Sequence, residues 1–208
     1  MKETGIMMSG DHPKLILDGL KTLTRRIYGL EKINKDPDNW VVEAYDGDMW
    51  VFRNKITGVR VFLKCPYGQV GDLLWVRETW ATEHRLDNLT ISELGHASEV
   101  PLFYKADSPI QTLLEIGKWR PSLFMPRWAS RITREITGLR PERLQEITEE
   151  DARAEGIIWV TIETAPQSGI YRPCAVENFS RLWDSLNAKR GYGWSENKWV
   201  WVIELERR

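Results

Sequence analysis

The sequence is poor in cysteine, lacks any long apolar run and carries no excess charge of either sign. Its two cysteines, Cys65 and Cys174, form neither a CxxC pair nor His/Cys metal spacing, which argues against a disulfide framework and predicts two buried thiols in a reducing compartment. No apolar stretch approaches the roughly 18 residues that cross a bilayer, and the N-terminus has no apolar core of signal-peptide length. We therefore expect a cytoplasmic protein without a membrane partner.

The charges nearly cancel, with 29 Lys and Arg against 30 Asp and Glu. No global positive field attracts nucleic acid, so any contact with it must come from a local cluster of basic residues. The sequence also lacks the glycine-rich motifs GxGxxG and GxxxxGK[ST], so dinucleotide and P-loop chemistries are unsupported. No GxSxG motif occurs, and the three histidines, His12, His84 and His96, lack metal-ligand spacing and are expected at the surface. We expect neither a metal nor another cofactor.

Apolar residues make up 42% of the 208 residues, which is enough to bury a core. We expect one domain over residues 1–208. Eleven tryptophans are expected mainly to pack this core, with one or two free to stack on a base. Short strands mixed with a few short helices predict an α+β fold around a curled, mixed or antiparallel sheet. We expect helices near residues 11–19, 148–156 and 175–187, a hairpin turn at 46–48, and strands near 41–45, 49–53, 59–65, 73–76, 102–107, 130–143 and 198–206.

The stretch "DGLKTLTRR", residues 18–26, contains the first candidate site. A lysine replaces histidine as a base when burial or a nearby cation lowers its pKa, and Arg25 and Arg26 would supply such a cation for Lys21. Thr24 would then be a nucleophile or a hydroxyl that orients water. By itself, however, the stretch is better interpreted as a solvated basic helix end followed by a turn.

A second candidate lies in "TEEDARAEG", where Thr148 and the acidic residues after it predict a short helix that ends at Gly156. Glu155 falls at the C-terminal end of this helix. The helix dipole disfavours a carboxylate there, which singles Glu155 out from Glu149 and Glu150 in the first turn.

Four segments together resemble the ASCH domain family: Gly19-x-Lys21-x-x-Thr24-x-Arg26, Gly71-Asp72-x-Leu74, "TEEDARAEG" and "WVWVIELE". That family has a PUA-like β-barrel shared with RNA-binding domains, so the resemblance implies this barrel with a few short flanking helices. The segments are most similar to small bacterial N4-acetylcytidine amidohydrolases. This chain is much longer than those enzymes, with its extra residues mainly at 27–70 and 79–126, which we expect to be insertions.

The resemblance implies that Lys21, Thr24 and Glu155 are catalytic, although Glu149 and Glu150 lie in the same predicted helix. The expected reaction is hydrolysis of the N4-acyl amide of cytidine or a cytosine derivative, a small nucleoside or nucleobase, to cytidine and a carboxylic acid, without a metal.

Other residues have supporting roles in this hypothesis. Arg26 would tune Lys21 or bind the developing oxyanion. Arg77 and Glu78 would either clamp the ligand or pair with each other. A tryptophan or Tyr171 would stack on the pyrimidine.

Two alternatives remain open. The chain would be an RNA-binding or modified-base-binding module, in which Arg25, Arg26, Arg127, Arg131 and Arg134 contact phosphates. Otherwise it would be a ribonuclease of the ASCH type, in which Lys21 and Arg26 stabilise phosphate charge. The oligomeric state is not indicated by the sequence.

Overall fold

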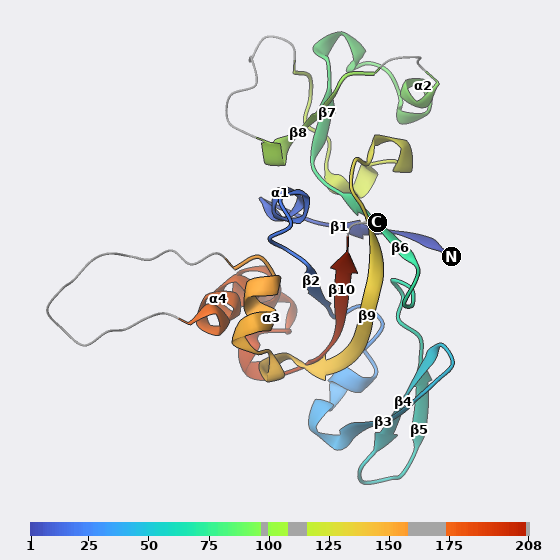
Figure 1. Ribbon diagram of the computed structural model, residues 1–208, viewed down its shortest axis with the longest axis vertical. Coiled ribbons are helices and arrows are strands. Elements are labelled where there is room, and N and C mark those ends of the chain that lie inside the picture. Colours follow the sequence, from blue (N-terminus) through green and yellow to red (C-terminus); the bar gives the residue numbers. More distant parts are fainter. Residues whose placement is uncertain (97–99, 108–115, 158–173, 207–208) are drawn as a thin grey trace, which may run out of the picture.

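The computed structural model describes residues 1–96, 100–107, 116–157 and 174–206. The α-helices of this part are α1 (His12–Leu17), α2 (Ile91–Gly95), α3 (Glu149–Ala154) and α4 (Ala175–Asn187), and the strands are β1 (Glu3–Met7), β2 (Leu23–Arg26), β3 (Trp40–Asp46), β4 (Met49–Asn54), β5 (Arg60–Leu63), β6 (Leu73–Arg77), β7 (Trp80–Thr82), β8 (Leu102–Tyr104), β9 (Thr133–Arg143) and β10 (Trp199–Glu206). The molecule is elongated, with β7, β8 and α2 at one end and β3, β4 and β5 at the other (Figure 1). The α+β prediction is confirmed.

The central sheet has the strand order β1-β6-β9-β10-β2. Strand β1 runs parallel to β6, whereas the other pairs are antiparallel, so the sheet is mixed, as predicted. Strands β1 and β2 are its two edges, yet Arg26 on β2 donates a hydrogen bond of 2.9 Å to the carbonyl of Met7 on β1. The sheet therefore curls until its edges approach each other, but the described strands do not close into a barrel.

Strand β10 lies between two hydrophobic cores, one on each face of the central sheet. Trp201 and Ile203 face one core, whereas Val200 and Val202 face another, as the period-two pattern of a strand requires. The second core contains Phe179 of α4 and side chains of α3, so these helices cover one face of the sheet. Both cores therefore pack against β10, the strand that pairs with β2 and so positions the residues of β2.

The segment 27–70 forms a meander of three antiparallel strands, β3-β4-β5. Gly47 has a φ of +67° in the tight turn between β3 and β4, where the sequence predicted a hairpin. Phe52 of β4 packs edge-on against Trp199, with ring centroids 5.4 Å apart. The meander thus shares the main core of the domain.

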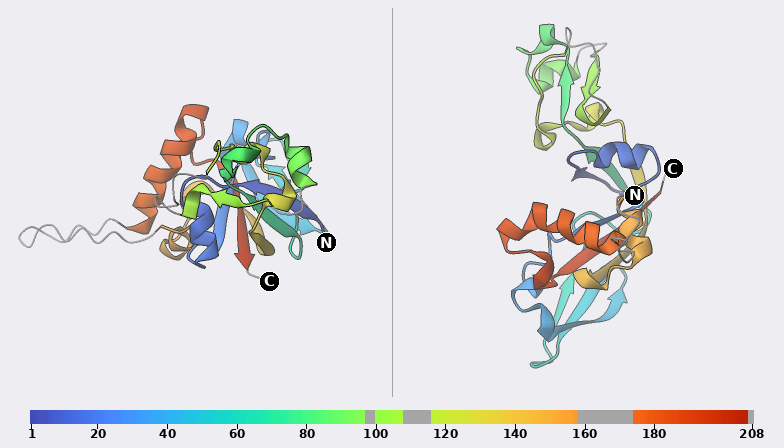
Figure 2. Two further views of the ribbon diagram at one scale, coloured as in Figure 1. Left: turned by 90° about the horizontal axis from the view of Figure 1, so that it is seen from above. Right: turned by 90° about the vertical axis from the view of Figure 1, so that its left-hand side faces the viewer.

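The segment 79–126 builds most of a small unit around the paired strands β7 and β8 and helix α2 (Figure 2). Its core contains Trp80, Leu94 and Met125 and is separate from the cores of the central sheet. In the described part of the chain, no helix is both long and apolar enough to span a membrane.

Two local predictions are wrong. Residues 23–26 are strand β2 rather than a helix end or turn, because they pair with β10, where Thr24 lies opposite Ile203. Cys65 is buried as predicted, but Cys174 is exposed, because it caps the N-terminus of α4 and accepts a hydrogen bond from the Glu177 amide.

Candidate active site

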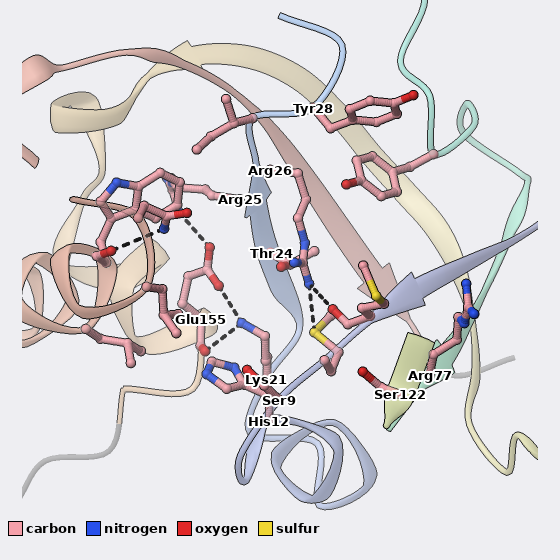
Figure 3. Close-up of a pocket in the computed structure, with 18 of the residues that line it drawn as sticks. Ser9, His12, Lys21, Thr24, Arg25, Arg26, Tyr28, Arg77, Ser122 and Glu155 are labelled. Atoms are coloured by element: carbon pink, nitrogen blue, oxygen red, sulfur yellow. Dashed lines mark hydrogen bonds and ion pairs between the residues drawn. The ribbon is translucent and has the colours of Figure 1, made fainter. Parts of the chain in front are cut away.

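A cavity of about 670 Å³ fills the gap between the two edge strands of the central sheet. Residues of β1 and β2 form opposite walls, helix α4 contributes apolar side chains, and Ser122 approaches from the segment 79–126 (Figure 3). The volume falls within the roughly 300–1,000 Å³ that is usual for small-molecule sites. Lys21, Thr24, Arg26, Arg77 and Glu155 all line this pocket.

Lys21 and Glu155 are in direct contact. The Lys21 Nζ donates a hydrogen bond of 2.8 Å to the Glu155 carbonyl and a second one to Oε2 of the Glu155 carboxylate. Only 2% of Lys21 and 5% of Glu155 are exposed, so this is a buried ion pair. Such a pair is costly to desolvate, which makes these two groups a candidate functional site.

The backbone holds both residues in place. Lys21 and Glu155 form an antiparallel β-bridge, and the Thr22 amide donates to the Ala154 carbonyl at 2.8 Å. Glu155 is the C-terminal cap of α3 and is followed by Gly156, whose φ of +87° reverses the chain. A Cβ at position 156 would lie 3.3 Å from the Cβ of Lys21, so glycine permits this close approach.

The structure distinguishes the three glutamates of the helix. Glu149 accepts hydrogen bonds from the backbone amides of Ala175 and Val176 at the start of α4. Glu150 is largely exposed. Of the three, Glu155 is the one that lines the pocket and contacts Lys21.

Burial lowers the pKa of Lys21 from its usual 10.5, because desolvation penalises the ammonium ion. The Glu155 carboxylate opposes this effect by its charge and its hydrogen bond, whereas Arg26 and Arg25 add to it by repulsion. The net effect is a lower pKa, so the neutral amine that a lysine base requires forms more readily than in an exposed lysine.

The Thr24 side chain lies on the pocket side of β2 and is 3% exposed. Its hydroxyl forms no hydrogen bond with any residue in the described part of the chain, so both its proton and its lone pairs remain available to a ligand. Figure 3 shows Thr24 between Lys21 and Arg26 along β2.

Arg25 lies next to the Lys21–Glu155 pair and is itself held by two other carboxylates. Its side chain is fully buried and binds Glu142 at 3.0 Å and Asp151 at 2.6 Å, and its guanidinium lies 5.8 Å from the centre of the Phe179 ring. The Arg25 Nη1 also lies 3.7 Å from the Glu155 Oε1, which has no hydrogen bond within the described residues. This arrangement leaves one oxygen of Glu155 free for a further partner.

Arg77 and Glu78 do not act as a unit. Arg77 lines the pocket, but Glu78 lies outside it and binds Arg131 at 2.9 Å and 3.0 Å. Burial raises the pKa of Glu78, although Arg131 opposes the shift. The predicted ion pair between Arg77 and Glu78 is therefore wrong, because adjacent residues of an extended chain point in opposite directions.

His12 is a pocket residue that the sequence placed at the surface. It is half-buried at the start of α1, and desolvation and the charge of Lys21 lower its pKa to about 4. Tyr28 and Tyr67 also line the pocket, where Figure 3 shows Tyr28 beyond Arg26. No spacing in the sequence marks these residues, because the fold alone brings them to β2. Tyr171, the stacking candidate, lies outside the described residues.

Comparison with known proteins gives no match to a family model, to a curated protein or to a solved structure. Within the described ranges, no group of three or more His, Cys, Asp or Glu side chains is arranged to hold a metal ion. The functional argument therefore depends on the residues of the pocket and on the sequence motifs.

Proposed function

We propose that this chain is an ASCH-type amidohydrolase with a PUA-like curled sheet, and that it hydrolyses the N4-acyl amide of a cytosine nucleoside. One observation carries the proposal: Lys21, whose pKa is lowered by burial, contacts Glu155 in the pocket that also presents the unpaired hydroxyl of Thr24. A base, an acid and a nucleophile thus share one cavity, which is what acyl transfer needs.

In the first step, the neutral Lys21 amine removes the proton from the Thr24 hydroxyl. The Thr24 Oγ1 attacks the acyl carbon of the substrate, and the carbonyl oxygen gains the negative charge of a tetrahedral intermediate. Arg26, on the same face of β2, supplies a positive charge for this oxyanion.

In the second step, the bond between the acyl carbon and the N4 nitrogen breaks. Glu155, in contact with the Lys21 ammonium, relays to N4 the proton that Lys21 took from Thr24, so the amine leaves as neutral cytosine and Lys21 returns to its neutral form. Water then attacks the acyl ester on Thr24, with Lys21 accepting a proton from the water and returning it to the Thr24 Oγ1 as the carboxylic acid is released. If Thr24 instead positions a water molecule for direct attack, no ester forms.

The RNA hypotheses have less support. Arg127 binds Glu3, Arg131 binds Glu78 and Asp107, and Arg134 donates to the carbonyl of Ile16. Arg25 is buried and paired as well. Four of the five arginines that were expected to contact phosphates of RNA are therefore engaged by other groups of the protein, and the fifth, Arg26, lines the pocket, which favours the small-molecule substrate.

The test is to incubate the purified protein with N4-acetylcytidine in the presence of EDTA and to measure cytidine and acetate. We expect turnover by the wild type, and a loss of roughly 100-fold or more in Thr24→Val, which keeps the shape of the side chain and removes the hydroxyl. Thr24→Ser should retain measurable activity. No hydrolysis of any N4-acylated cytosine by the wild type would refute the proposal.

Mass spectrometry of the acid-quenched reaction separates the two forms of the mechanism. A covalent acyl group on the peptide that contains Thr24, absent from Thr24→Val, would identify Thr24 as the nucleophile. Turnover without this adduct, combined with residual activity in Thr24→Val, would instead assign the attack to water.

A further inference from the structure

The cations that line the pocket outnumber its carboxylates. Among the described lining residues, Lys21, Arg25, Arg26, Arg77 and Arg190 carry positive charge, and Glu155 carries the negative charge. Lys21 is paired with Glu155, and Arg25 is paired with two carboxylates behind the pocket. The pocket therefore keeps a positive excess that no described carboxylate balances.

Arg26 is one of the unbalanced charges. Its Nη2 donates to the Met7 carbonyl and contacts the Met8 sulfur, both at 2.9 Å, and its buried Nε has no hydrogen-bond partner in the described part of the chain. No described carboxylate lies within ion-pair distance of it. Burial lowers the pKa of Arg26, because desolvation penalises the guanidinium ion, and the charges of Tyr67 and Glu155 oppose this shift.

Arg77 carries the second unbalanced charge of the pocket. Its guanidinium lies 5.5 Å from the centre of the Trp75 ring, and its buried Nε also has no partner among the described residues. The side chain crosses Gly5 of β1, where a Cβ would lie 3.0 Å from the Arg77 Cδ and 2.7 Å from the Trp75 ring. Glycine at this position makes room for the arginine along the pocket wall.

The two arginines are linked through one residue of β1. Met7 lies opposite Arg77 in the register of β1 and β6, and its carbonyl accepts the hydrogen bond from Arg26. Figure 3 shows Arg77 and Ser122 toward the end of the pocket opposite to Glu155. Arg77 thus lies away from the Lys21–Glu155 pair, where it would meet a different part of the same ligand, whereas Arg26 lies beside Thr24 (Figure 3).

A phosphate group fits this end of the pocket. A guanidinium offers a planar fork of donors that binds phosphate oxygens in pairs, and the interaction strengthens where water is excluded. Nucleosides become anionic at neutral pH most simply by phosphorylation. The cavity also has the volume for a base, a ribose and one phosphate in a single ligand.

We propose that the pocket binds a nucleoside monophosphate, with its phosphate at Arg77 and its base at Lys21, Thr24 and Glu155, beside Arg26. The position of the base rests on the proposed function, whereas the phosphate site follows from the Arg77 guanidinium, which forms no ion pair with a described carboxylate. The substrate is then an N4-acylated cytidine monophosphate in preference to the free nucleoside.

Isothermal titration calorimetry of the full chain tests the phosphate site without any hydrolysis. We expect cytidine 5′-monophosphate to bind roughly tenfold or more tightly than cytidine, because each charge-assisted hydrogen bond contributes on the order of that factor. Arg77→Gln should remove most of this difference, and Arg77→Lys should restore part of it. Arg85→Gln, which removes an exposed arginine in the segment 79–126, should leave it unchanged.

Two outcomes would overturn the proposal. One is equal affinity for cytidine and its monophosphate in the wild type. The other is tighter binding of a short oligocytidine without a terminal phosphate, which would assign the cationic wall to phosphodiesters of RNA. If the monophosphate binds as expected but no N4-acyl compound is hydrolysed, the phosphate site stands and the proposed reaction fails.

Discussion

Lys21 and Glu155 are joined both by their backbones, in an antiparallel bridge, and by their side chains, in a buried ion pair. Both residues lie outside regular elements: Lys21 precedes β2, and Glu155 caps α3. A shift of either backbone would separate the two charges. The geometry of the pair is therefore fixed by the fold and does not depend on a ligand.

The first prediction concerns activity and pH. In the proposed mechanism the neutral form of Lys21 is the base, so kcat/KM should rise with pH until Lys21 has lost its proton, and the midpoint should lie below the usual lysine pKa of 10.5. Lys21→Met should lower kcat/KM by about 10²–10⁴-fold and abolish this rise. Lys14→Met, which removes an exposed lysine of α1, serves as the control and should keep the wild-type profile.

The second prediction concerns the charge on Glu155. Its carboxylate raises the pKa of Lys21 against the effect of burial, so Glu155→Gln should lower the pKa of Lys21 further. NMR titration of protein with isotope-labelled lysine measures this change directly. Glu150→Gln removes an exposed carboxylate of the same helix and should leave the titration unaltered. An upward shift in Glu155→Gln would show that the two groups do not interact as described.

The third prediction concerns stability and His12. The pKa of His12 is about 4 in the folded state and 6.5 in the unfolded state, so the unfolded chain binds the extra proton between these values. The contribution of neutral His12 to stability is complete above pH 6.5 and is lost as the pH falls toward 4. Between pH 7.5 and pH 5, the wild type should therefore lose up to about 2 kcal/mol relative to His12→Gln.

Urea unfolding of both proteins at the two pH values measures this difference. His84 has an exposed side chain, so His84→Gln should show the same pH dependence as the wild type. If the difference between the wild type and His12→Gln is the same at both pH values, His12 is not shielded from water.

The fourth prediction uses two glycines with nearly the same backbone angle. Gly156 has a φ of +87° and Gly191 a φ of +80°. An added Cβ would have no heavy atom within 4 Å at Gly191. At Gly156 it would lie 2.9 Å from the Leu15 Cδ1 and 3.3 Å from the Lys21 Cβ. Gly191→Ala should cost only the backbone term, about 1–2 kcal/mol. Gly156→Ala should cost more and should also lower activity, since Lys21 must move.

Chemical denaturation gives the two free energies, and the hydrolysis assay gives the activities. Equal destabilisation with full activity in both variants would show that the space beside Gly156 is not restricted.

Local signals in the sequence predicted much of the fold. Thr148 caps α3 and Gly156 follows its end, Gly47 marks the hairpin, and the alternation in β10 separates two cores. Strands β1 and β2 carried no such signal. The sequence of strand β2 is a basic run; in the structure it pairs with β10, and Glu142 and Asp151 neutralise Arg25.

The candidate site was predictable where a motif and a resemblance named its residues. Lys21, Thr24 and Glu155 reach one pocket, although the roles assigned to them remain predictions. His12 and Tyr67 could not be identified, because their place in the pocket depends on how α1 and the loop after β5 pack against β2. Glu78 was selected as a neighbour of Arg77 in the sequence, and the strand geometry directs it elsewhere.

The curled sheet also determines when the pocket can exist during synthesis of the protein. Thr24 on β2 lies opposite Ile203 of β10, and Met7 on β1 lies opposite Arg77 of β6. Each of these two walls of the pocket therefore pairs with a strand that the ribosome synthesises later. Until β10 emerges, the surroundings that bury Lys21 are incomplete. The lowered pKa of Lys21 is therefore a property of the completed fold.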